Sequence, residues 1–296
     1  MPNWNQVVKE ITSSSGALDR VRRKYISLLS KYTNRNTIVY YSGWLQRNNT
    51  AIHSIIYDID TNSFMTTING LDTSKGLDLI LHTPGGDTAA TEAIVVYLRK
   101  MFGTNIRCFV PQLAMSAGTM IAFACKEIYM GKQSSIGPID PQLGGLPAFA
   151  VLDDFEKAKK EIKDDPSTAQ MWDAVFRKVN PSFITECEQA VQLSSLLARN
   201  WLQTGMFLKD PKAVDKANTI VDALNNHKDT KLHARHIDAA QAKSFGLCIK
   251  DLEEDQKLQD YVLTVHHVCM YSFSQVPTLY KIVENQRGVG VYTMAQ

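Results

Sequence analysis

Apolar residues recur along the chain in two patterns, one typical of buried strands and one typical of helices. Short runs of aliphatic, β-branched and aromatic residues predict strands, because an uninterrupted apolar run of about four to eight residues fits a strand covered on both faces. These runs are residues 37–42, 77–82, 105–110 and 127–130. Apolar residues at helical spacing predict two short helices between residues 4 and 32 and a helix over 62–68.

Two of the predicted strands lead through a turn of small residues into a helix. The strand at 77–82 ends at a Pro-Gly-Gly turn (84–86), after which Asp87 can cap a helix whose apolar residues reach position 102. The strand at 105–110 leads through a second turn into an apolar helix at 117–125. Alternating strands and helices of this length indicate a parallel α/β sheet.

The pattern changes near residue 152. Charged helical stretches without a convincing strand follow one another over 152–226, which indicates a helical insertion or subdomain. Residues 236–249 predict a helix that ends at Gly246 and then a strand. The remaining residues, 251–296, predict a tail with one helix at 254–268.

Composition limits the classes of protein to which the chain can belong. The chain has 296 residues, of which 44% are apolar and 21% charged, as in ordinary soluble globular proteins of one large or two modest domains. Its net charge of +2 provides no basic field for phosphates, so we expect no nucleic acid partner.

The five cysteines are odd in number, widely spaced and mostly set among apolar residues. They predict buried thiols in a reducing compartment and neither a disulfide framework nor a metal site. The N-terminal residues do not resemble a secretory signal, and no apolar run reaches the roughly 18 residues that span a bilayer. We therefore expect a cytoplasmic protein without a membrane span.

Ser116 is the clearest candidate for a catalytic residue. In parallel α/β folds the ligand crevice lies at the carboxyl ends of the strands, so the turns at 84–86 and 111–116 are expected to be neighbours in space. A serine at a strand-to-helix turn can expose its hydroxyl beside unpaired N–H groups, which suits a nucleophile with an oxyanion pocket. Each feature alone is also typical of an ordinary helix cap or turn.

Three motifs in this order carry a family resemblance. They are Leu-His-Thr-Pro-Gly-Gly at 81–86, Ala-Met-Ser-Ala-Gly-Thr at 114–119 and Ile-Gly-Pro-Ile-Asp-Pro-Gln-Leu-Gly at 136–144. The chain resembles the serine dehydrogenase proteinase family, distant relatives of the Clp protease proteolytic subunit and signal peptide peptidase A. The resemblance runs from about residue 20 to 250 and is thinnest through the helical stretch.

The resemblance implies a ClpP/crotonase-like α/β fold of repeated ββα units with a helical insertion. The predicted parts are an N-terminal helical segment (1–36), the α/β core (37–150), the helical insertion (151–230), the last core helix and strand (231–250) and the C-terminal tail (251–296).

The resemblance also implies a serine peptidase site. By it Ser116 is the nucleophile, and Gly86 and Ala117 donate backbone N–H groups to the oxyanion. Asp140 stands where the Clp subunit has its histidine, and His233 lies near the position of the Clp aspartate. The altered order, Ser then Asp then His, preserves the chemistry because only the geometry of the three groups matters.

Two other residues compete with His233 as the general base. His236 directly precedes Ile237 and is equally compatible with a cap or surface residue, whereas His233 fits the family pattern of a histidine four residues before that isoleucine. Signal peptide peptidase relatives use a lysine, for which Lys157 is the candidate, although it stands in a charge run typical of a solvated helix face.

The sequence therefore predicts a serine hydrolase that cleaves polypeptides through an acyl-enzyme, without a metal or other cofactor. Relatives assemble into rings, so we expect a homo-oligomer. Two alternatives remain open. One is an α/β-hydrolase esterase, because residues 114–118 differ by one residue from its Gly-x-Ser-x-Gly motif. The other is a scaffold protein with a degenerate site.

Overall fold

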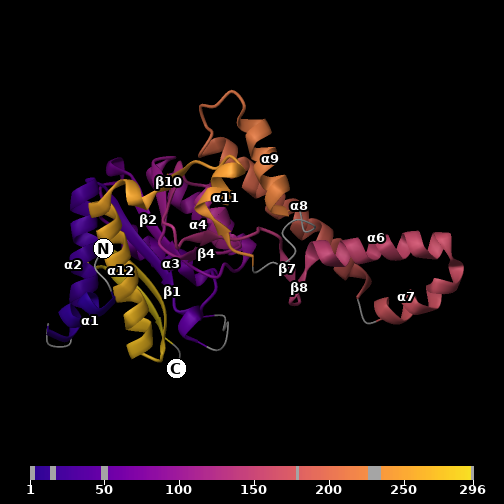
Figure 1. Ribbon diagram of the computed structural model, residues 1–296, viewed down its shortest axis with the longest axis horizontal. Coiled ribbons are helices and arrows are strands. Elements are labelled where there is room, and N and C mark those ends of the chain that lie inside the picture. The colour runs from indigo at the N-terminus through magenta and orange to yellow at the C-terminus, as the bar shows by residue number, and fades with distance from the viewer. Residues whose placement is uncertain (1–3, 14–17, 48–52, 178–179, 226–234, 295–296) are drawn as a thin grey trace.

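The computed structural model describes residues 4–13, 18–47, 53–177, 180–225 and 235–294 (Figure 1). A seven-stranded sheet forms the centre of the body, in the order β10-β5-β3-β2-β1-β11-β12. The strands are β1 (Asn36–Ser42), β2 (Leu77–His82), β3 (Ile106–Val110), β5 (Glu127–Met130), β10 (Ile249–Asp251), β11 (Leu279–Asn285) and β12 (Gly290–Met294). Neighbours from β10 to β1 are parallel, and β11 and β12 add an antiparallel hairpin beside β1. This confirms a mixed α/β fold with a mostly parallel sheet, whereas the repeated ββα units stay a prediction.

Helices cover both faces of the sheet, which explains why β1 and β2 are buried at every position. The helices are α1 (Trp4–Ser13), α2 (Leu18–Thr33), α3 (Ile59–Ile68), α4 (Thr88–Phe102), α5 (Ala117–Phe123), α6 (Ala148–Asp164), α7 (Ala169–Phe176), α8 (Pro181–Thr204), α9 (Ala213–Asn225), α11 (Ala239–Ser244) and α12 (Gln256–Gln275). Alternate residues of β2 enter different cores: Leu79 and Leu81 pack with α3, α4 and α5, and Ile80 packs with α2 and α12. The sheet is therefore the middle layer of three.

The helix after β2 begins as the sequence predicts. The Asp87 carboxylate accepts a hydrogen bond of 2.7 Å from the N–H of Ala90, and Gly103 with φ 60° follows the last turn of α4. Between these ends, Ile94, Leu98 and Phe102 are buried against the sheet. Burial of each such side chain contributes about 1.5 to 3 kcal/mol.

A second, three-stranded sheet lies at the carboxyl ends of the parallel strands. Its strands are β4 (Leu113–Ala114), β6 (Ser135–Ile136) and β9 (Ile237–Asp238), in the order β4-β6-β9. None of these three short strands was predicted as a strand: β4 lies in a predicted turn, β9 lies within a predicted helix, and β6 lies where no element was predicted. Two-residue strands carry no periodicity that a sequence could reveal.

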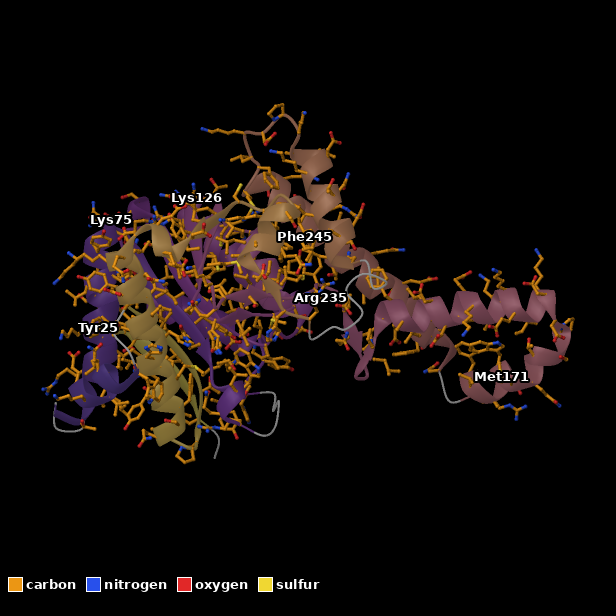
Figure 2. The ribbon with its side chains drawn as sticks, in the orientation of Figure 1. Tyr25, Lys75, Lys126, Met171, Arg235 and Phe245 are labelled. Carbon is orange, nitrogen blue, oxygen red and sulfur yellow. The ribbon has the colours of Figure 1, made fainter. Side chains whose placement is uncertain are left out.

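The first part of the predicted helical insertion extends away from the body as an arm made of α6 and α7, which follows the small hairpin of β7 (Gln142–Leu143) and β8 (Leu146–Pro147) (Figure 1). The later helices of the insertion, α8 and α9, contribute buried residues to the main core. Figure 2 shows Met171 far out on this arm. Trp172 stacks on Phe176 at 5.7 Å between ring centroids, while Met171 and Val175 are 54% and 51% exposed. The arm thus has a small aromatic core of its own and an apolar exposed side.

The C-terminal residues are not a loose tail. They form α12, which is longer than predicted, and the hairpin of β11 and β12, which pairs with β1 in the central sheet. The hairpin was missed because Lys281, Glu284 and Asn285 interrupt the apolar pattern of β11, although all three are buried. Within the described part of the chain, no helix is long and apolar enough to cross a bilayer.

A buried pair of histidines lies where β2 ends beneath α12. The rings of His82 and His266 are 5.6 Å apart, and Nδ1 of His266 lies 3.2 Å from the Tyr41 hydroxyl oxygen. Burial, with a smaller contribution from neighbouring His267, lowers the pKa of His266 to about 3. Burial also lowers the pKa of His82. Both side chains are therefore neutral in the folded protein at neutral pH.

We expect the folded protein to lose stability as the pH falls below neutral. The folded-state pKa of His266 lies below its unfolded value of 6.5, so the stability present above pH 6.5 is lost progressively toward about pH 3. At pH 5 this residue alone should lower the free energy of unfolding by about 2 kcal/mol. Denaturant titrations at pH 7 and pH 5 measure the loss, which His266→Asn should reduce. An equal pH dependence in both proteins would contradict the assignment.

Candidate active site

Ser116 stands at the turn between β4 and α5 in an unusual backbone conformation. Its φ and ψ are 51° and −118°, and among the described non-glycine residues only Asn34 also has a positive φ. The side chain is partly exposed and makes no capping hydrogen bond to α5. Such strain at a strand-to-helix turn is typical of the elbows that present a catalytic serine. Ser116 therefore does not act as an ordinary helix cap, because its hydroxyl accepts no hydrogen bond from the first turn of α5.

The Pro-Gly-Gly turn packs directly against the Ser116 turn, as the sequence predicts. The N–H of Thr83 donates to the Leu113 carbonyl (3.1 Å), and the N–H of Met115 donates to the Thr83 carbonyl (3.0 Å). A Cβ on Gly85 would lie 2.8 Å from the Ser116 Cβ and 3.0 Å from the Ala117 nitrogen. Gly85 is required for two reasons: its φ of 101° is unfavourable for other residues, and a Cβ would clash with the Ser116 turn.

Two backbone N–H groups near Ser116 are candidates for an oxyanion pocket. Gly86 forms a parallel bridge with Ile56, but the two hydrogen bonds of that bridge use the Gly85 carbonyl and the Asp87 N–H. Within the described residues, the N–H groups of Gly86 and Ala117 donate no hydrogen bond to the protein. Unpaired donors beside a serine are what stabilisation of an oxyanion requires.

Thr119 joins the serine turn to the segment that carries Asp140. Its hydroxyl donates to the Ala114 carbonyl (2.8 Å), and the N–H of Gly137 donates to the same hydroxyl (2.9 Å). Gly137 also lies close to the serine turn, because a Cβ there would lie 2.7 Å from the Met115 Cε and 3.3 Å from the Ser116 nitrogen. Sequence reasoning assigned no role to Thr119 or Gly137, although both stand inside the motifs.

Asp140 is almost fully buried, at 3% exposure, in the segment that follows β6. One of its carboxylate oxygens accepts a hydrogen bond from the Gln142 side chain (3.2 Å). The preceding residue is fixed from α8, where the Ser194 hydroxyl donates to the Ile139 carbonyl (2.8 Å). A carboxylate is thus held in the interior at the end of the small sheet.

The three candidate bases differ in where the structure puts them. His233 lies outside the described residues. His236 is exposed and directly precedes β9, whose Ile237 pairs with Ile136 of β6, which in turn pairs with Ala114 of β4. Because β9 runs antiparallel to β6, the first residue of β9 lies at the end of the small sheet where β4 and β6 finish. Ser116 and Asp140 follow these two strand ends. Figure 2 shows Arg235 between the body and the arm.

Lys157 lies on the arm helix α6. Its side chain is 62% exposed, and its Nζ lies 3.9 Å from a Glu161 oxygen and 5.9 Å from the centre of the Trp172 ring. A lysine needs a desolvated setting to act as a base near neutral pH. The observed position provides no such setting.

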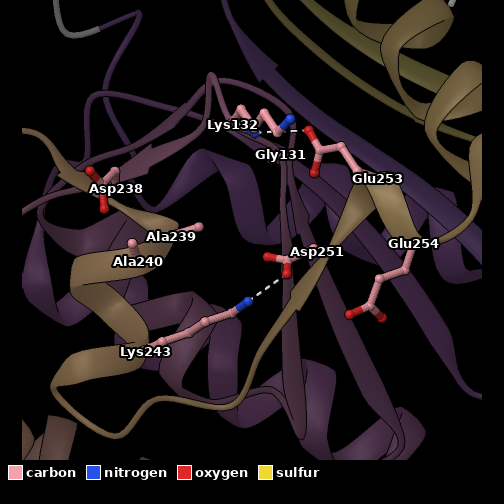
Figure 3. A pocket seen from close by; sticks show the side chains of 9 residues that line it. All are labelled: Gly131, Lys132, Asp238, Ala239, Ala240, Lys243, Asp251, Glu253 and Glu254. Carbon is pink, nitrogen blue, oxygen red and sulfur yellow. Dashed lines mark hydrogen bonds and ion pairs between the residues drawn. The ribbon is translucent and has the colours of Figure 1, made fainter.

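A pocket of about 550 Å³ opens at the carboxyl ends of β5 and β10 (Figure 3). Its lining residues are Gly131, Lys132, Asp238, Ala239, Ala240, Lys243, Asp251, Glu253 and Glu254. None of the predicted site residues is among them. Lys243 and Asp251 point toward each other across the pocket as an ion pair of 2.5 Å, so its charged groups are already partly compensated. Among the described residues, no cluster of His, Cys, Asp or Glu could hold a metal ion.

Comparison with known proteins identifies the family. The family model of ClpP-like SDH-type serine proteinases matches residues 19–186, more than half of the chain. The chain belongs to this family. The match confirms the resemblance to serine dehydrogenase proteinases that the three motifs indicate, and it covers both turns and Asp140.

Two similar proteins come from Methanocaldococcus jannaschii. The uncharacterized protein MJ0137 is 30% identical over 196 residues, which are 66% of this chain and 61% of that protein. The uncharacterized protein MJ1495 is 33% identical over 114 residues, or 38% of this chain and 39% of that protein. The chain thus spans less than two thirds of the length of these relatives.

Gly85→Ala should damage the site more than a matched glycine replacement elsewhere. Gly246 has nearly the same φ, 99°, but a Cβ there meets nothing within 4 Å. Both alanine variants should lose about 1 to 3 kcal/mol through backbone strain. Only Gly85→Ala should also displace the Ser116 turn and slow the reaction of Ser116 with a fluorophosphonate. Denaturant titration and labelling rates measure the two effects, and equal labelling of both variants would contradict the packing argument.

Proposed function

We propose that this protein is a serine peptidase that hydrolyses polypeptides through an acyl-enzyme on Ser116. The observation that carries the proposal is the strained Ser116 turn, where an uncapped hydroxyl lies beside two N–H groups that donate to none of the described residues. In the proposed reaction the Ser116 oxygen attacks the peptide carbonyl, and Gly86 and Ala117 donate hydrogen bonds to the oxyanion. Water then hydrolyses the ester and releases the second product.

We further propose that His233 is the general base and that Asp140 orients it. The base takes the proton of the Ser116 hydroxyl and later gives it to the leaving amine. The burial of Asp140 and the entry of the chain into β9 at the same end of the small sheet support this assignment. His236 is the alternative base on the same segment, and a dyad of Ser116 with Lys157 finds no support in the exposed position of that lysine.

The protein is proposed to act in the cytoplasm as a homo-oligomer. The described cysteines are free and, apart from Cys248, buried, which suits a reducing compartment. The arm of α6 and α7 exposes Met171 and Val175 away from the body, and Leu146 at its base is 53% exposed. Exposed apolar residues on a projecting element favour contacts between copies. The alternative function is a scaffold that keeps the fold without the chemistry.

Ser116→Ala should abolish hydrolysis and fluorophosphonate labelling while leaving the fold intact. The hydroxyl is the proposed nucleophile, and alanine fits the space that it occupies. Losses of about 10⁴-fold or more in turnover are typical of such a change. Labelling followed by mass spectrometry of the modified peptide, with circular dichroism as the fold control, measures both outcomes. A wild-type protein that is not labelled at Ser116 favours the scaffold.

His233→Ala should be nearly as damaging as Ser116→Ala, because nucleophile and base act as one unit. Asp140→Asn should lower turnover by up to about 10⁴-fold with little change in substrate binding. His236→Ala and Lys157→Ala should retain most of the activity. The rate should rise with pH around a value of about 6.5, as expected for a histidine base. Loss of activity in Lys157→Ala together with an active His233→Ala would reverse the assignment.

A further inference from the structure

A buried ion pair joins the C-terminal hairpin to the first turn of α3. Lys281 of β11 and Asp60 of α3 are both fully buried, with Nζ 2.6 and 2.8 Å from the two carboxylate oxygens. The Tyr40 hydroxyl also donates to Asp60, at 2.8 Å. Replacing a buried ion pair with apolar residues is often neutral or stabilising. The pair therefore calls for an explanation other than its contribution to stability.

The same two side chains bind the backbone on both sides of Ile56. Nζ of Lys281 donates to the Ile55 carbonyl (2.9 Å), and the N–H of Tyr57 donates to the Asp60 carboxylate (2.9 Å). Ile56 itself is fully buried. The ion pair thus holds the backbone position of Ile56 through the residues on either side of it.

Ile56 in turn fixes the Pro-Gly-Gly turn. Its N–H donates to the Gly85 carbonyl (2.8 Å), and its carbonyl accepts from the N–H of Asp87 (2.9 Å). The approach is so close that a Cβ on Gly86 would lie 2.3 Å from the Ile56 nitrogen and oxygen. With Ile56 on one side and the Ser116 turn on the other, the Gly86 N–H has little freedom of orientation.

We propose that Lys281 and Asp60 are positioning residues for the candidate oxyanion pocket, acting through Ile56 to orient the Gly86 N–H beside Ser116. This inference rests on the proposed function, because it matters only if Ser116 is a nucleophile. It assigns a catalytic contribution to the C-terminal hairpin, which lies beyond residues 19–186 that match the family. Neither residue touches the substrate in this arrangement.

Lys281→Met tests the proposal, and Arg22→Met is its matched control. Arg22 of α2 and Glu284 of β11 form another fully buried ion pair, with Nε of Arg22 2.6 Å from the carboxylate, but it makes no contact with Ile56 or the turn. Both variants remove the cation of a buried ion pair that joins β11 to a helix. Glu284 keeps the Arg23 guanidinium at 2.6 Å, whereas Asp60 loses its cation, so denaturant titration measures the stability of each variant separately. Only Lys281→Met should disturb the turn.

The measurements are the rate of fluorophosphonate labelling at Ser116, kcat and KM for a peptide substrate, and denaturant titration, all on the full chain. Removing one oxyanion donor costs about 10² to 10³ in rate, so a displaced donor should slow labelling and kcat by about tenfold or more with KM nearly unchanged. Arg22→Met should stay within about twofold of the wild type. Equal rates in Lys281→Met and wild type, or equal losses in both variants, would overturn the proposal.

A second variant guards against a protein that fails to fold. The double change Asp60→Asn with Lys281→Met leaves no unpaired charge in the interior and keeps an acceptor for the N–H of Tyr57. It should fold and still show slow labelling, and wild-type labelling of this folded variant would again overturn the inference. A wild-type protein that is not labelled at all contradicts the proposed function instead, so the two failures are distinguishable.

Discussion

The close approach of two backbone turns is the constraint on which the candidate site depends. The turn after β2 and the turn before α5 share a bridge between Thr83 and Ala114, and Gly85 lies against Ser116 with no room for a side chain. Such contact is possible only because β2 and β3 are adjacent parallel strands that end at the same edge of the sheet. The geometry of the candidate site follows from a packing arrangement between main chains.

That arrangement includes a strained serine, and the surroundings keep it in place. The backbone conformation of Ser116 costs free energy. Such a conformation persists only where contacts with neighbouring residues hold it in place. Thr119 links the strands on either side through its hydroxyl, and the small sheet continues the link to β9. The result is a rigid frame around a hydroxyl that has no capping role.

The outer supports of this frame come from distant parts of the chain. Ser194 of α8 fixes the residue before Asp140, and Lys281 of β11 reaches the segment that flanks Gly86. These contacts use buried polar groups in place of apolar packing. Polar contacts have defined directions, so they specify the orientation of a backbone segment more narrowly than apolar surfaces do.

The sequence by itself determined the parallel α/β class, the cap at Asp87, the two turns and the family, because these depend on local periodicity, on glycine and on contiguous motifs. It missed the β11 and β12 hairpin and the roles of Thr119 and Lys281. A lysine or glutamate is predicted to be exposed unless its partner is known. The partner of Lys281 is Asp60 and that of Glu284 is Arg22, each more than 200 residues away in the sequence. Only the tertiary structure decided which charges are interior, because burial of a charge depends on a partner that distant sequence supplies.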